Sequence, residues 1–210
     1  MNILPAADGI ELALKILHDG GVIAHATETC YGFACDLKNP DAVKKLFAIK
    51  HRPLYQPVSA LFSSLDEAKK YVVWNDEAQK LADEYLPGPL TIILPLLSKT
   101  PTILFAIPPE QPINQLTNKQ SMGIRISSFS LAAQLVREFG SPLSTTSANL
   151  HGQPNPYSAE DIVEQFKDQK FQPDLILDSG KLPPTPPSTV IDFTSAKDAK
   201  TLRKGDIPIA

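Results

Sequence analysis

Apolar residues follow two alternating patterns of spacing along this chain of 210 residues. Apolar residues that recur every three or four positions predict amphipathic helices, whereas short continuous apolar runs predict buried strands. Helices are expected over about 8–19, 39–50, 76–85, 130–139 and 158–166, with a further helix start at Ser64. Strands are expected over 22–26, 58–62, 91–97, 103–107, 122–126, 143–146, 175–178 and 189–193. The alternation predicts an α/β protein, and pairs of strands without an intervening helix favour a mixed parallel and antiparallel sheet.

Helix boundaries are marked by capping residues. Asp8 and Glu11 have the spacing of a capping box, as do Ser64 and Glu67. Asn39-Pro40 is typical of a helix start. We therefore expect Lys50 to lie at the end of the helix that Asn39 begins, on its apolar face.

Composition narrows the class of protein. Hydrophobic residues make up 42% of the chain, which is enough for one packed domain spanning residues 1–210. The formal net charge of -3 argues against a protein that coats nucleic acid by bulk charge, although a local basic groove is compatible with it. The longest apolar run, 90–97, is too short to cross a membrane, and no signal peptide precedes it, so we expect a cytoplasmic protein.

Cysteine and histidine spacing offers no zinc site. Cys30 and Cys35 are expected to be buried, reduced thiols. We also find no phosphate-binding P-loop, no GxGxxG pattern and no nucleophile motif. Any nucleotide would therefore bind through another architecture.

Three polar segments follow predicted strands or helices, where open α/β sheets place ligands. They are 27–32, 50–53 and 144–149. Each has a structural alternative: a capped turn, basic residues that stabilise a helix C-terminus, and a Ser/Thr-rich loop, respectively. Functionally, Lys50 and Arg52 could converge on a polyphosphate. Arg125 lies in an apolar strand, so it needs either a bound anion or an internal carboxylate as its partner.

The order of these segments is similar to that in the YrdC-like family, whose characterised members are L-threonylcarbamoyl-AMP synthases. The resemblance covers about residues 8–207 and rests on seven segments. They are Gly20-Gly21-Val22-Ile23, Thr27-Glu28-Thr29-x-Tyr31-Gly32, Lys50-x-Arg52-Pro53, Pro87-Gly88-Pro89-Leu90-Thr91, Ser147-Ala148-Asn149-x-x-Gly152, Ser188-Thr189-Val190 and Arg203-x-Gly205.

The resemblance implies a twisted mixed sheet that encloses a large, positively charged cavity. It also implies that L-threonine, bicarbonate and ATP, with Mg²⁺, give threonylcarbamoyl-AMP and pyrophosphate. The catalytic residues would be Lys50 and Arg52. ATP would be bound by Lys50, Arg52, Gln56, Ser147, Asn149 and Arg203, and threonine by Thr29, Arg125 and Ser188. A protein nucleophile is not needed, because threonine carbamate itself attacks the α-phosphate while the enzyme positions and neutralises the phosphates.

Three positions depart from the family pattern. Ala26 stands where proline usually precedes the threonine, Ser127 where proline commonly follows the arginine strand, and Gln56 where asparagine is usual. Ala26 and Ser127 lie beside expected contacts, so the departures bear on threonine specificity more than on nucleotide binding.

The resemblance implies the short, stand-alone form of the family. Its product would pass to a partner complex that modifies tRNA adenosine, and weak tRNA binding is possible. Two alternatives stay open: a paralogue that uses another acyl or amino-acid substrate, and a non-catalytic RNA-binding module.

Overall fold

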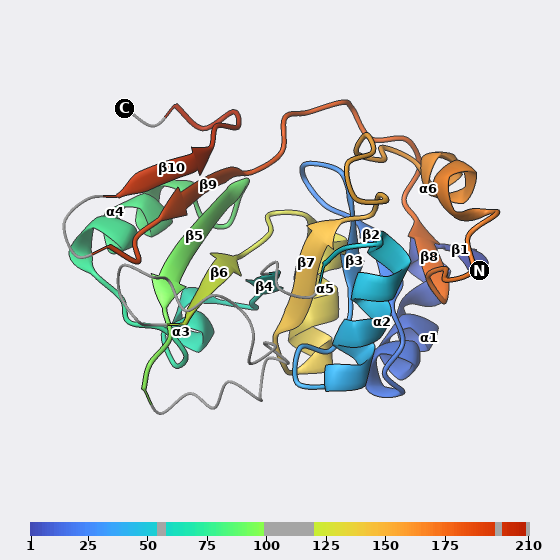
Figure 1. Ribbon diagram of the computed structural model, residues 1–210, viewed down its shortest axis with the longest axis horizontal. Coiled ribbons are helices and arrows are strands. Elements are labelled where there is room, and N and C mark those ends of the chain that lie inside the picture. The colour runs from blue at the N-terminus through green and yellow to red at the C-terminus, as the bar shows by residue number, and fades with distance from the viewer. Residues whose placement is uncertain (54–57, 99–119, 196–198, 209–210) are drawn as a thin grey trace.

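A computed structural model describes residues 1–53, 58–98, 120–195 and 199–208. Their strands form one ten-stranded sheet in the order β1-β8-β2-β3-β7-β4-β6-β5-β9-β10 (Figure 1). The strands are β1 (Asn2–Pro5), β2 (Ile23–Ala26), β3 (Tyr31–Ala34), β4 (Ser59–Leu61), β5 (Leu90–Pro95), β6 (Ser121–Arg125), β7 (Leu143–Ser147), β8 (Leu175–Asp178), β9 (Thr189–Asp192) and β10 (Lys200–Arg203). The helices are α1 (Ala6–His18), α2 (Pro40–Lys50), α3 (Leu65–Ala68), α4 (Asp76–Tyr85), α5 (Ser130–Phe139) and α6 (Ala159–Phe166).

The sheet is mixed, as expected. Strands β1 and β8, β2 and β8, β4 and β6, and β5 and β9 pair in parallel, whereas the pairs β2–β3, β3–β7, β4–β7, β5–β6 and β9–β10 are antiparallel. Strand β7 joins the two halves of the sheet, because it pairs with β3 on one side and with β4 on the other. Residues of both halves therefore meet along β7.

Two hydrophobic clusters hold helices against the sheet. Helices α1 and α5 share one cluster with β2, β3, β7 and β8, in which Leu17, Leu135 and Leu175 are fully buried. The larger cluster packs α2, α4 and α6 against the sheet, with Phe33 and Phe166 in an edge-to-face contact at 5.5 Å. Burying such large apolar side chains is the main stabilising contribution to the fold.

Most predicted elements are confirmed within one or two residues. Helix α2 begins at Pro40, and the Asn39 side chain accepts hydrogen bonds from the backbone N–H groups of Asp41 and Ala42. The helix ends at Lys50, as expected. Both cysteines are free and buried, also as expected. The predicted strand over 103–107 lies outside the described residues.

Other predictions were wrong or incomplete. No capping box forms at Asp8, because α1 already begins at Ala6 and its N-cap, Pro5, has no side chain that can accept a hydrogen bond. At α3, Ser64 caps Glu67 as expected, but the Glu67 carboxylate bonds Ser63 instead of returning to Ser64. Strands β1, β3 and β10 were missed. Both β1 and β10 are short, exposed edge strands, which lack a buried apolar run.

Candidate active site

A cavity of about 220 Å³ lies over the middle of the sheet, where its two halves meet. Its walls come from the turn between β2 and β3, the segment after α2, strands β4, β5, β6 and β7, the loop after β7, the start of β9 and the end of β10. The lining residues are mostly hydroxyl-bearing or basic: Thr29, Cys30, Arg52, Val58, Ser59, Thr91, Arg125, Thr145, Thr146, Ser147, Asn155, Pro187, Ser188, Val190 and Arg203. Six of the nine site residues predicted from the sequence are among them.

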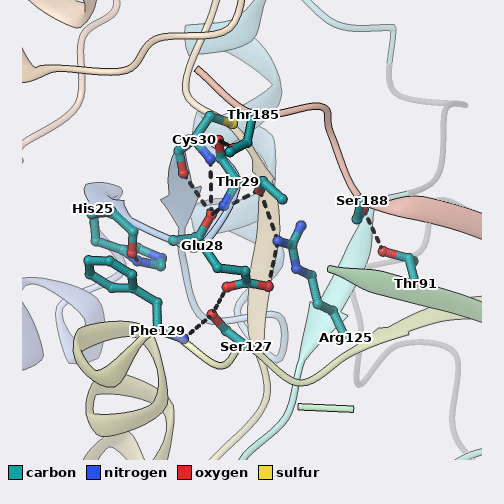
Figure 2. A network of polar contacts seen from close by, with 12 residues as sticks. His25, Glu28, Thr29, Cys30, Thr91, Arg125, Ser127, Phe129, Thr185 and Ser188 are labelled. Atoms are coloured by element: carbon teal, nitrogen blue, oxygen red, sulfur yellow. Dashed lines mark hydrogen bonds and ion pairs between the residues drawn. The ribbon is translucent and has the colours of Figure 1, made fainter. Parts of the chain in front are cut away.

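The turn between β2 and β3 presents Thr29 to the cavity. Buried Thr27 organises this turn, because its Oγ1 donates to the Cys30 carbonyl at 2.7 Å and accepts from the N–H of Thr29 at 3.2 Å. The Thr185 hydroxyl, which comes from the segment before β9, donates to the Thr29 carbonyl at 2.7 Å (Figure 2). The turn is thus fixed on both sides, and the Thr29 hydroxyl is held in place.

Arg125 ends β6 and crosses to this turn (Figure 2). Its Nη2 donates to Glu28 Oε1 at 2.9 Å and to Thr29 Oγ1 at 3.0 Å. The internal carboxylate that the sequence left as an alternative partner for Arg125 is therefore Glu28. Ser127 donates a hydrogen bond to the second oxygen of Glu28 and accepts one from the N–H of Phe129 at 3.1 Å. The departure at Ser127 thus adds a contact to the carboxylate that holds Arg125.

Ser188 links Arg203 and Thr91 in the wall of the cavity. The Arg203 guanidinium donates to the Ser188 carbonyl at 2.8 Å and to its hydroxyl at 2.9 Å. The same hydroxyl lies 3.0 Å from Thr91 Oγ1. Ser188 therefore orients Arg203 as well as lining the cavity.

Lys50 lies behind the cavity wall. Its ammonium donates to the carbonyl oxygens of Ser147 and Asn149, the latter at 2.8 Å, and to Asn149 Oδ1 at 3.2 Å. The Asn149 amide carbonyl also accepts from the Ser147 hydroxyl at 2.6 Å. Lys50 thus fastens the loop after β7, while Ser147 and Arg52 face the cavity.

His51 accounts for the direction that Arg52 takes. His51 is the C-cap of α2 and has a left-handed backbone with φ of 50°, which turns the chain back after the helix. The Arg52 guanidinium then lies 5.9 Å from the centre of the Phe47 ring and 3.5 Å from Thr146 Oγ1. Two neighbouring cations consequently point to different places, Lys50 beneath the loop and Arg52 into the cavity.

Comparison with known proteins identifies the family. The Sua5/YciO/YrdC family, described as "Telomere recombination", matches residues 15–205. The chain belongs to this family. A Vibrio campbellii relative named threonylcarbamoyl-AMP synthase is 31% identical over 200 residues, which cover 93% of this chain and 98% of the relative.

Two solved structures of Sua5/YciO/YrdC proteins have the same fold. Pyrococcus abyssi Sua5, in a crystal structure with L-threonine, superposes with a TM-score of 0.79 at 28% identity and covers 93% of this chain. The present chain spans 54% of that protein. Escherichia coli YciO superposes with a TM-score of 0.78 at 26% identity, over 98% of this chain and 93% of YciO.

Three basic side chains in or beside this cavity have lowered pKa values. Burial lowers the pKa of Lys50 to about 7, and the neighbouring Arg52 lowers it further. Burial also holds the pKa of Arg52 below its usual value. The pKa of Arg203 is lowered by burial and then by Arg125. A bound anion would offset these shifts, because a nearby negative charge favours the protonated form of each cation. The large, net positive cavity implied by the resemblance nevertheless stays a prediction.

The donor set does not suit a resident metal ion. Across the described ranges, no cluster of three His, Cys, Asp or Glu side chains could hold a metal. The residues that line the cavity include no carboxylate within the same ranges, whereas Mg²⁺ prefers carboxylate and phosphate oxygens.

Sequence reasoning missed several parts of the site. Ser59 and Asn155 line the cavity but belong to no segment that the sequence singled out. Alternation along β4 could have placed Ser59 on the cavity face only if the pairing of β4 with β7 had been known. The predicted ATP contact Gln56 lies outside the described residues. Within the described part of the chain, every helix is too short or too polar to span a bilayer.

Proposed function

We propose that this protein is a threonylcarbamoyl-AMP synthase, which converts L-threonine, bicarbonate and ATP into threonylcarbamoyl-AMP and pyrophosphate. The observation that carries the proposal is the convergence of Arg52, Arg125 and Arg203 with hydroxyl groups on one cavity. The relatives named for this activity, and the Pyrococcus abyssi Sua5 structure with L-threonine, support the same choice of substrates.

The chemistry needs positioning and charge, not a protein nucleophile. The threonine amine bonds to the carbon of CO₂ derived from bicarbonate and loses a proton. A carbamate oxygen then attacks the α-phosphorus of ATP, and the bond to pyrophosphate breaks. Cys30, the thiol in the cavity wall, is a poor nucleophile, because burial raises its pKa. Guanidinium groups instead stabilise the negative charge that moves onto the leaving group.

We assign three roles to the predicted residues. Arg52 and the Ser147 hydroxyl would contact the phosphates, and Arg203 would lie near the nucleotide. Thr29, Arg125 and Ser188 would hold threonine or its carbamoyl derivative. Lys50 and Asn149 would act through the loop that they fasten, since both lie outside the cavity lining.

The test is pyrophosphate release from MgATP, with and without L-threonine and bicarbonate. We expect release only when all three substrates are present, together with a product of the mass of threonylcarbamoyl-AMP. Release that another amino acid supports better than threonine would favour the paralogue. An absence of release, combined with salt-sensitive RNA binding, would favour the RNA-binding module. Arg52→Ala should raise the KM for ATP, because it removes a cation from the cavity.

Downstream steps belong to the same proposal. Threonylcarbamoyl-AMP is a reactive mixed anhydride, so a protein that transfers its threonylcarbamoyl group to tRNA adenosine would have to consume it. We expect that transfer complex as the functional partner, any direct tRNA contact to be weak, and the protein to act in the cytoplasm.

A further inference from the structure

Ser127 occupies a junction between the cavity and the start of α5. The residue is buried, with 3% of its surface exposed, and it follows β6 directly. Its hydroxyl donates to Glu28 and accepts from the N–H of Phe129 at 3.1 Å. Both hydrogen-bonding directions of one hydroxyl are thus used, and the group is tied to the backbone at the N-cap of α5 (Figure 2).

Glu28 passes this constraint on to Arg125. One carboxylate oxygen of Glu28 accepts from Ser127, and the other accepts from Arg125 Nη2 at 2.9 Å. The side chains of Arg125 and Glu28 are only 10% and 14% exposed, so water cannot readily replace either partner. A carboxylate held at both oxygens has one orientation, and that orientation fixes where the guanidinium lies.

Of Ser127, Glu28 and Arg125, only Arg125 lines the cavity. Its Nη2 also contacts the Thr29 hydroxyl at 3.0 Å, and its Nε is buried without a hydrogen-bond partner among the described residues. The guanidinium is thus held from one side and retains unused donor capacity.

We propose that Ser127 is a positioning residue for the amino-acid subsite, which sets the orientation of Arg125 through the Glu28 carboxylate. The inference rests on the proposed function for the identity of the amino acid. It assigns Ser127 no contact with substrate. Loss of its hydroxyl should therefore weaken binding of the amino acid while leaving ATP binding and the chemical step largely intact.

The experiment measures initial rates of pyrophosphate release for the wild type and Ser127→Ala, with L-threonine and MgATP varied separately. We expect the KM for threonine to rise about tenfold, because one hydrogen bond to a buried carboxylate is lost. The kcat and the KM for ATP should stay within about twofold. Ser127→Thr, which keeps the hydroxyl, should restore most of the affinity for threonine.

Ser144→Ala is the matched control. Ser144 is a fully buried serine that accepts one backbone hydrogen bond, from Cys35 at 2.9 Å, and it does not line the cavity. We expect its KM for threonine to equal that of the wild type. The proposal is overturned if Ser127→Ala leaves the KM for threonine unchanged, raises both KM values equally, or mainly lowers kcat. It is also overturned if Ser127→Thr behaves like the alanine variant.

A second measurement does not depend on catalysis. Urea unfolding of Ser127→Ala, Glu28→Ala and the double variant should give a double variant less destabilised than the sum of the single changes. Strict additivity would contradict the Ser127–Glu28 link. Wild-type protein that releases no pyrophosphate with threonine would instead refute the proposed function, and this coupling would still be measurable.

Discussion

Replacing Lys50 with methionine removes the ammonium group and keeps a side chain of similar length. Lys50 is 3% exposed, and burial lowers its pKa from 10.5 to about 7. The unfolded chain therefore binds one more proton than the folded protein between about pH 7 and 10.5. Below this window Lys50 is charged in both states, and the full penalty of burying the charge is present. As pH rises through the window the penalty is removed, so stability increases.

The size of the effect follows from the shift. One pKa unit corresponds to about 1.4 kcal/mol, and titration of the folded form is half complete near pH 7. From pH 7 to pH 9 Lys50 should thus add about 2 kcal/mol to the free energy of unfolding. Lys50→Met cannot titrate and lacks this gain. Its free energy of unfolding relative to the wild type should fall by that amount over the same interval.

Urea unfolding of both proteins at pH 6, 7, 8 and 9, at constant ionic strength, measures the difference. Lys44→Met is the control, since Lys44 lies on the same helix with its side chain 69% exposed. We expect that control to differ from the wild type by a constant amount across the series. Parallel curves for Lys50→Met and the wild type would refute the reasoning, because they would mean that Lys50 keeps its proton in the folded protein throughout.

Three further substitutions test other parts of the structure. Glu28→Gln leaves the buried Arg125 without its carboxylate and should destabilise the protein by about 3–5 kcal/mol in urea unfolding at pH 7; a loss below about 1 kcal/mol would mean that water replaces the pair. Gly123→Ala places a Cβ against Ser59 Oγ beside the cavity, so we expect a loss of about 1–3 kcal/mol and weaker threonine binding by calorimetry, whereas unchanged affinity would show that Ser59 can move aside. Asn39→Ala removes the N-cap of α2 and should cost about 1 kcal/mol with kcat unaltered; a changed kcat would reveal that α2 transmits the loss to Arg52.

The helix signals in the sequence were informative because they are local. Asn39-Pro40 fixed the start of α2, and the spacing of apolar residues placed Lys50 at its end. The polar segments 27–32 and 144–149 also both reach the cavity, as their order along the chain suggested. Short-range chemistry thus identified the elements and many of the residues that the site uses.

Long-range contacts explain what the sequence left undetermined. The partner of Arg125 is Glu28, which lies 97 positions earlier in the chain. The residues around Arg125 were equally compatible with an internal carboxylate and with a bound anion as its partner. Lys50 and Arg52 look equivalent as two cations after a helix. The left-handed backbone at His51 separates them, and the residues next to His51 in the sequence do not predict that conformation. The roles of these two residues depend on tertiary packing that no short motif encodes.

The order of strands in the sheet also governs how the protein folds. Among the strands of the described residues, only the neighbouring pairs β2–β3, β5–β6 and β9–β10 follow one another in sequence order, and β1 must find β8 more than 150 residues away. Such non-local pairing makes folding slow. The cavity walls come from both halves of the sheet, so a ligand pocket exists only after these pairings are complete. If threonine and ATP bind there as proposed, they should stabilise the protein by slowing its unfolding and should do little to speed its folding.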